Sequence, residues 1–108
     1  MSETDISRDI REKLEAHGYR CDRLQSGQVK VSGGWMHLAR KGTPDTIVFG
    51  KRSTCGHADV FFLETKTPIG KLSEHQIAWH AWAEKLGVRV AVVRSAREAL
   101  DILRKWEN

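Results

Sequence analysis

Apolar residues recur at helical spacing near the N-terminus. At about 100° per residue, three of them fall on one stripe: Ile6, Ile10 and Leu14. This pattern predicts a helix over residues 2–17. Ser2 or Thr4 can cap its start, and Gly18 can end it.

Two further helices are predicted in the C-terminal half. Ser73 is a good N-cap for a helix that runs to about Leu86 and ends at Gly87. Gln76 follows Ser73 by three residues, so that it can complete a capping box. A last helix is marked by apolar residues at i, i+3, i+4 and i+7 spacing: Ala96, Ala99, Leu100 and Leu103.

Short apolar runs outside these helices predict strands. They lie at residues 19–24, 28–31, 46–49, 58–66 and 88–93. Ser26-Gly27 is typical of a turn between the first two strands, whereas the glycine-rich residues 32–42 and the polar residues 50–57 are typical of loops. The order is a helix, several strands, a helix, a strand and a helix. It predicts an α/β fold with a mixed central sheet flanked by helices.

Composition and charge add little to this picture. The 108 residues suffice for one domain, and 40% hydrophobic with 30% charged residues is ordinary for a soluble protein. The formal net charge of +4 favours a polyanionic partner, but only mildly. Without a basic segment followed by an apolar run, and without a long apolar stretch, we expect a cytoplasmic protein with no membrane contact. Cys21 and Cys55 lie far apart, which is more typical of reduced thiols than of a zinc site.

An acid and a base end the apolar strand predicted over residues 58–66. Residues two apart on a strand point to the same face, so Glu64 and Lys66 stand side by side. A charged pair at the end of a buried strand has to be solvated, paired or bound to a metal. Taken alone, the pair is more typical of a solvated strand end or a simple salt bridge.

Asp45 changes that interpretation. It follows Pro44, whose fixed backbone places it at the start of the preceding strand. If the two strands are neighbours, Asp45 and Glu64 meet at one end of the sheet. Two carboxylates there form a hard oxygen site suited to Mg²⁺, with the Thr65 carbonyl as a third ligand. Such a cation can polarise a phosphodiester and activate water, while Lys66 orients that water and offsets charge.

Two segments resemble a nuclease signature. The runs Gly-Thr-Pro-Asp (residues 42–45) and Phe-Phe-Leu-Glu-Thr-Lys (residues 61–66) resemble the Pro-Asp…Glu-X-Lys pattern of the PD-(D/E)XK nucleases. The run Gly-Lys-Leu-Ser-Glu-His-Gln-Ile-Ala-Trp (residues 70–79) is similar to one branch of them, the virus-type replication-repair nuclease (VRR-NUC) domain. Members of that branch carry an acid in helix one, Gly-X-Pro-Asp, Glu-X-Lys and Lys-Leu-Ser-X-X-Gln, in this order.

The resemblance spans nearly the whole chain and implies both a fold and a site. The fold is α/β and PD-(D/E)XK restriction-endonuclease-like, with an αβββαβ core plus a C-terminal helix and one nuclease domain over residues 1–108. The implied catalytic set is Glu3, Asp45, Glu64, Lys66 and Gln76.

Two members of this set have alternatives. Glu3 falls on the apolar stripe of the first helix, where burying a charge is costly, although a frayed first turn would leave it in water. Glu12 is also available as the helix-one acid, but it falls on the opposite face. Gln76 can complete the capping box of its helix, or it can reach the site and bind a phosphate or a metal-bound water.

Basic and aromatic residues near these motifs predict contacts with DNA. The basic ones are Arg40, Lys41, Lys51, Arg52 and Lys71. Lys71 is equally typical of a solvated surface. Trp35 can stack on a base or anchor its loop, whereas Trp79, Trp82 and Trp106 are more typical of packing residues.

The resemblance implies an endonuclease that uses Mg²⁺ or Mn²⁺ and acts on branched DNA, above all four-way (Holliday) junctions. We expect a homodimer, since resolving a junction requires two symmetric cuts, and exposed Trp82 or Trp106 can help form it. Two alternatives stay open: a non-catalytic DNA-binding module whose carboxylates are structural, and an RNA-cleaving nuclease on the same fold.

Overall fold

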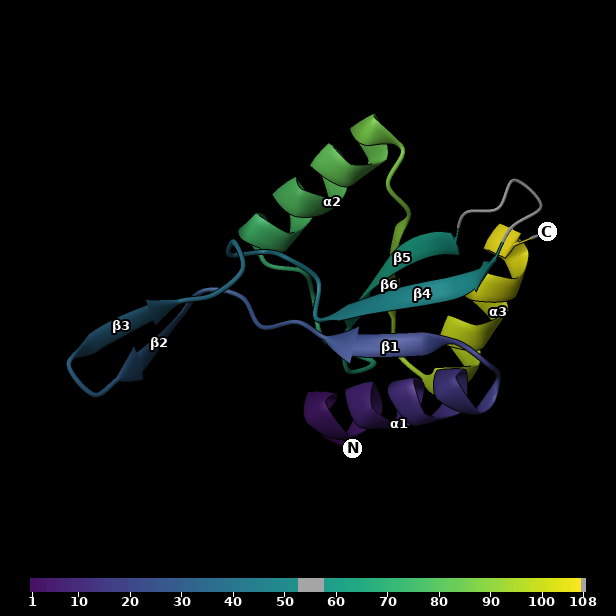
Figure 1. Ribbon diagram of the computed structural model, residues 1–108, viewed down its shortest axis with the longest axis horizontal. Coiled ribbons are helices and arrows are strands. Elements are labelled where there is room, and N and C mark those ends of the chain that lie inside the picture. The colour runs from purple at the N-terminus through teal and green to yellow at the C-terminus, as the bar shows by residue number, and fades with distance from the viewer. Residues whose placement is uncertain (53–57, 108) are drawn as a thin grey trace.

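A four-stranded mixed sheet forms the centre of the protein in the computed structural model, which describes residues 1–52 and 58–107. The strand order is β1-β4-β5-β6. Three strands pair antiparallel, and β6 runs parallel to β5: β1 (Arg20–Arg23), β4 (Thr46–Arg52), β5 (Ala58–Thr65) and β6 (Val90–Val93). The sheet is accompanied by three helices: α1 (Glu3–Ala16), α2 (Glu74–Leu86) and α3 (Ala96–Glu107). The predicted mixed sheet flanked by helices is therefore observed (Figure 1).

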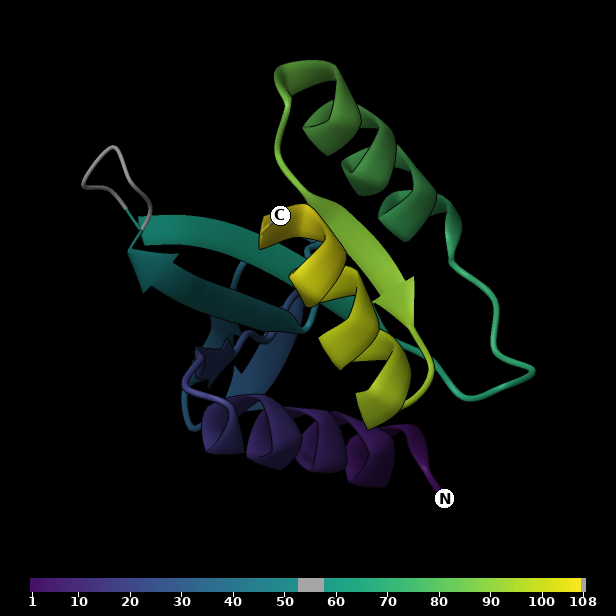
Figure 2. The ribbon, with the colours of Figure 1, turned by 90° about the vertical axis from the view of Figure 1, so that its right-hand side faces the viewer.

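The two faces of the sheet are covered unequally. Alternate residues of the inner strands, such as Val48, Phe61 and Leu63, are fully buried against α1 and α3, which lie side by side (Figure 2). The opposite face meets α2, where the Phe62 and Trp79 rings pack with centroids 5.2 Å apart. The hydrophobic core therefore lies on one side, and α2 stands off on the other.

The helix ends follow the sequence signals. Ser2 caps α1 and forms a capping box with Asp5. Ser73 caps α2 in the same way with Gln76, and Gly87 ends it in the left-handed conformation. No helix in the described part of the chain is long and apolar enough to cross a bilayer.

A hairpin projects from the sheet where a loop was expected. Its strands are β2 (Gln28–Val31) and β3 (Gly34–His37), which pair antiparallel through a two-residue turn at Ser32-Gly33. The interpretation of residues 32–42 as a loop is therefore wrong for residues 34–37, because Gly33 at φ +88° makes a hairpin turn inside the glycine-rich segment. The predicted turn at Ser26-Gly27 does not join two paired strands, since β1 pairs with β4.

The hairpin is tied to the main sheet at the first residue before β4. Leu24 N–H donates to the Asp45 carbonyl at 2.7 Å, and an isolated bridge joins Ser26 to Ala39. The hairpin thus projects from the end of the sheet where β4 begins and β5 ends (Figure 1).

Candidate active site

Strand pairing brings the two predicted carboxylates to one end of the sheet, where β4 begins and β5 ends. Thr46 of β4 stands opposite Leu63 of β5, and in the same antiparallel register Asp45 falls opposite Glu64. The predicted neighbourhood of these two strands is therefore observed.

Hydrogen bonds hold the Asp45 carboxylate in place. Its Oδ2 accepts from the Thr65 backbone N–H at 2.9 Å, and its Oδ1 accepts from the hydroxyls of Thr46 (2.8 Å) and Thr65 (3.1 Å). Two carboxylate oxygens offer about four lone-pair positions, so acceptor capacity remains for a cation. The orientation of this acid is thus fixed by neighbours that directly follow the two acids in sequence.

Glu64 is the buried acid of the site. Its residue surface is only 2% exposed, and its Oε1 has no hydrogen-bond partner among the described residues. Burial, followed by the nearby charge of Asp45, raises the pKa of Glu64 to about 8, although Lys66 acts in the opposite direction. An ionised carboxylate in this position needs more positive charge than Lys66 provides, and a bound cation would supply it.

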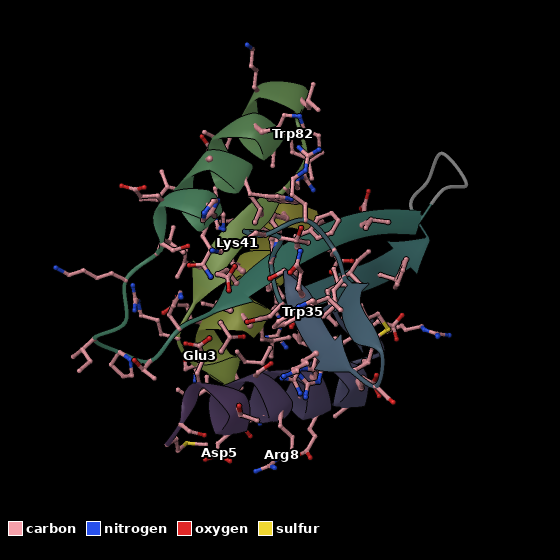
Figure 3. The ribbon with its side chains drawn as sticks, turned by 90° about the vertical axis from the view of Figure 1, so that its left-hand side faces the viewer. Glu3, Asp5, Arg8, Trp35, Lys41 and Trp82 are labelled. Carbon is pink, nitrogen blue, oxygen red and sulfur yellow. The ribbon has the colours of Figure 1, made fainter. Side chains whose placement is uncertain are left out.

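Glu3 completes an acidic cluster from a different element. One carboxylate oxygen from each of Glu3, Asp45 and Glu64 lies within 4.8 Å of the other two. Glu3 is the first residue of α1, and its side chain is exposed at the start of that helix (Figure 3). The structure thus brings Glu3 to the site, whereas Glu12 is exposed and is not a member of this cluster.

Lys66 and Thr65 adjoin the cluster along β5. Lys66 lies two residues after Glu64, directly beyond the end of β5, and close enough for its charge to lower the pKa of Glu64. Thr65 directs its N–H toward Asp45, and in an extended strand the carbonyl of the same residue points to the same side of the strand. The Thr65 carbonyl therefore points to the side of β5 on which Asp45 lies, where it was predicted to serve as a ligand.

The donor set fits a hard divalent cation. Three carboxylates converge, one of them has a buried oxygen without a partner, and a single lysine offsets part of their charge. Oxygen-only sites of this kind suit Mg²⁺ and Mn²⁺. Chemically, the arrangement can hold such an ion against a phosphate oxygen at an exposed edge of the protein.

Gln76 is engaged in the cap of α2. Its Oε1 accepts from the Ser73 N–H at 2.9 Å, and its own N–H donates to the Ser73 hydroxyl at 3.2 Å. The structural alternative considered for Gln76 is thus observed. The predicted role of Gln76 at the active site would use its amide Nε2, and that role stays a prediction.

Two of the predicted DNA contacts line a cleft beside α2. Arg40 and Lys41 are exposed and line a cleft of about 860 Å³ together with side chains of α2: His75, Ala78, Trp79 and Trp82. Lys71 is exposed in the segment between β5 and α2. The side chains of Lys51 and Arg52 lie outside the described residues, so their predicted contacts stay predictions.

Sequence reasoning left two interpretations open for Trp35 and for Trp82. Trp82 was interpreted as a packing residue and, in a homodimer, as an exposed one; it packs on Trp79 and is 52% exposed on the wall of the cleft. Trp35 is 61% exposed on β3, which excludes its interpretation as a buried anchor of the segment. Trp106 does pack internally, stacked on Phe61 at a centroid distance of 5.3 Å. The missed signal was the mixture of Arg40 and Lys41 with aromatic residues spaced three apart on α2.

Comparisons with known proteins agree with this arrangement. The family model of the VRR-NUC domain matches residues 1–97. No curated protein matches the chain at a significant level. A solved structure described as a VRR_NUC domain superposes with a TM-score of 0.66 at 22% sequence identity, and the match covers 98% of this chain and 99% of that one. This likeness confirms the predicted α/β fold of the PD-(D/E)XK type.

Proposed function

This chain belongs to the VRR-NUC family of nuclease domains, and from that premise we propose that it is a divalent-metal-dependent endonuclease that hydrolyses phosphodiester bonds in branched DNA. The observation that supports this most strongly is the acidic cluster of Glu3, Asp45 and Glu64, with the unpartnered Oε1 of Glu64 inside it. Lys66 beside the cluster supplies the positive charge that phosphodiester hydrolysis uses.

Each residue has a defined part in this proposal. Asp45 and Glu64 would hold the ion, with Glu3 and the Thr65 carbonyl as further ligands. When bound, Mg²⁺ or Mn²⁺ supplies Lewis-acid activation of the scissile phosphate and of the attacking water. Lys66 orients that water and offsets the negative charge that develops on the phosphate.

Other residues prepare the site or hold the DNA. Thr46 and the Thr65 hydroxyl keep the Asp45 carboxylate in one orientation, so that little reorganisation accompanies binding. Gln76 contacts the scissile phosphate through Nε2. The basic residues hold phosphates of the DNA backbone without reading sequence: Arg40, Lys41, Lys71 and, at the opposite end of β4 from Asp45, Lys51 and Arg52.

Four-way junctions are the branched substrate that we favour, and they require a homodimer. The described residues of one chain carry a single acidic cluster, whereas two symmetric cuts need two clusters related by a two-fold axis. One face of the hairpin supports this proposal, because it exposes three apolar side chains: Val29, Val31 and Met36. Sedimentation velocity should give twice the chain mass of 12.3 kDa, and a monomer at micromolar concentration would exclude the dimer.

A cleavage assay tests the proposed activity. Labelled flaps, forks and four-way junctions are incubated with Mg²⁺ or Mn²⁺, and we expect Asp45→Asn and Lys66→Ala to lose cutting by about two or more orders of magnitude while DNA binding persists. Glu12→Gln is the matched control, since it removes an exposed acid of α1 outside the cluster.

Each contrary outcome has a distinct meaning. Retained cutting by either Asp45→Asn or Lys66→Ala would remove the mechanism. Metal-independent DNA binding without any cleavage would identify a non-catalytic module. Preferential cutting of matched RNA substrates would identify an RNA nuclease on the same fold.

A further inference from the structure

The cleft between α2 and the turn at residues 40–43 combines aromatic and cationic side chains. Its volume is about 860 Å³, and its lining includes Arg40 and Lys41 from the turn as well as Trp79 and Trp82 from α2. In Figure 3, which looks onto the hairpin end of the molecule, Lys41 lies between Glu3 on α1 and Trp82 on α2. Nothing in the proposed cutting of a phosphodiester requires the two tryptophans.

The aromatic wall is rigid and open. Trp79 is anchored on Phe62 of the sheet at a centroid distance of 5.2 Å, and Trp82 meets the Trp79 ring edge-on at 5.4 Å. The three rings lead from the sheet to the surface, where Trp82 remains 52% exposed. A ring that is held by a neighbour and half exposed can receive a flat partner with little loss of conformational freedom.

The cationic wall is held by a tight backbone contact. Thr43 N–H donates to the Arg40 carbonyl at 3.0 Å and closes the turn. Gly42, at φ +96°, lies so close to α2 that an added Cβ would stand 2.3 Å from the His75 carbonyl oxygen. Because only glycine fits there, the backbone next to Lys41 is held against the first turn of α2.

The cleft lies a short distance from the acidic cluster. Asp45 lies four positions after Lys41 in the sequence, so their Cα atoms are at most about 14 Å apart. A stacked DNA strand carries one phosphate per roughly 3.4 Å, so this distance spans about four nucleotides or fewer. A strand that passes through the cleft can therefore continue to the carboxylates.

From these contacts we infer that the cleft binds an unpaired DNA nucleotide, whose base stacks on Trp82 and whose flanking phosphates contact Arg40 and Lys41. Positive charge on one wall and a half-exposed indole on the other match the two components of a single strand, the phosphate and the base face. This inference rests on the proposed function. It requires an unpaired base near the cut, which a flap or fork already presents and which a four-way junction supplies when base pairs open at its branch point.

A binding measurement separates base stacking from charge. Fluorescence anisotropy compares a short single-stranded DNA with an abasic strand of equal length, which keeps the phosphates and lacks the bases, in the absence of divalent metal. We expect the chain to prefer the base-containing strand by about 5- to 150-fold, and Trp82→Ala to abolish that preference. Trp82→Phe should retain most of it, because a ring remains.

Two further variants serve as controls. Ile77→Ala alters another exposed side chain of α2, 55% exposed and outside the cleft lining, and should leave both affinities unchanged. Lys41→Gln should weaken both strands by the same factor, because it removes a phosphate contact only.

Three results would overturn the inference. They are equal binding of the two strands by the unaltered chain, an unchanged preference in Trp82→Ala, and a Trp82→Ala effect confined to the sedimentation coefficient, which would assign the cleft to a second copy. The measurement is independent of the cutting chemistry. Asp45→Asn should keep the preference for the base-containing strand. If the cleft shows no such preference but Asp45→Asn still loses cleavage, the inference about the cleft is wrong and the proposed nuclease activity is not.

Discussion

At the scale of single residues, the burial of Glu64 determines how the site responds to pH. Its pKa of about 8 lies above the ordinary value of 4.5, first because of burial and second because of the charge of Asp45. The folded chain therefore binds a proton more tightly than the unfolded chain between these two values. The stabilising contribution of this proton is complete below about pH 4.5 and is lost as the pH rises through about 8.

This residue gives the first prediction. In metal-free buffer, the free energy of unfolding should fall by a few kcal/mol between about pH 5 and pH 8 relative to Glu64→Gln, which carries no titratable proton. Urea unfolding of both proteins across this range measures the difference. Added Mn²⁺ should reduce the loss, because the cation takes the place of the proton. Parallel curves for the two proteins would contradict the assignment of Glu64 as a buried acid.

The residues around the acids show what the sequence could reveal and what it could not. Asp45, Glu64 and Lys66 were found because a strand period of two and a proline before the acid restrict where these side chains can lie. The hydrogen bonds from Thr46 and Thr65 were missed, since a hydroxyl's partner depends on the register of two strands. The sequence pattern placed Glu3 on the apolar stripe, and only the packing of α1 brought it beside the sheet edge.

At the scale of elements, α2 carries both a capping box at its start and the aromatic wall of the cleft. Its N-terminal Ser73 and Gln76 form a capping box, and its next turns carry the aromatic wall of the cleft. Helix boundaries were predicted well here, because caps are short-range signals. The hairpin was not, because Ser26-Gly27 and Gly33-Gly34 both resemble turns, and the partner of each strand is decided by the sheet.

Gln76 allows the two roles to be separated. Gln76→Ala should lower the free energy of unfolding by about 1 kcal/mol, because it removes the hydrogen bond to the Ser73 N–H. Gln76→Glu should preserve stability, since glutamate completes the same capping box. If Nε2 contacts the scissile phosphate, Gln76→Glu should nevertheless cut DNA about tenfold or more slowly. Unfolding and single-turnover cleavage are measured on the same preparations. Unchanged cutting by Gln76→Glu would show that Gln76 only caps α2 and has no role in cleavage.

At the scale of the whole molecule, the functional features gather at one end of the sheet. The acidic cluster, the start of the hairpin and the basic turn before β4 all adjoin the segment around Asp45. The order of elements was sufficient to predict the mixed sheet. Consecutive strands favour antiparallel pairs, whereas a strand that follows a crossover helix can pair parallel. The exposure of the hairpin could not be predicted, and Trp82 was expected to be exposed only as a dimer contact, since periodicity shows which face is apolar but not what covers it.

The most direct test of the account is the anomalous diffraction of a crystal soaked in Mn²⁺. We expect one strong peak among the carboxylates of Asp45, Glu64 and Glu3, with the Thr65 carbonyl next to it. The same soak of an Asp45→Asn crystal should show no peak at that position. A Mn²⁺ peak only at other places on the protein, or carboxylates that stay unligated at saturating metal, would contradict the metal-dependent nuclease site described above.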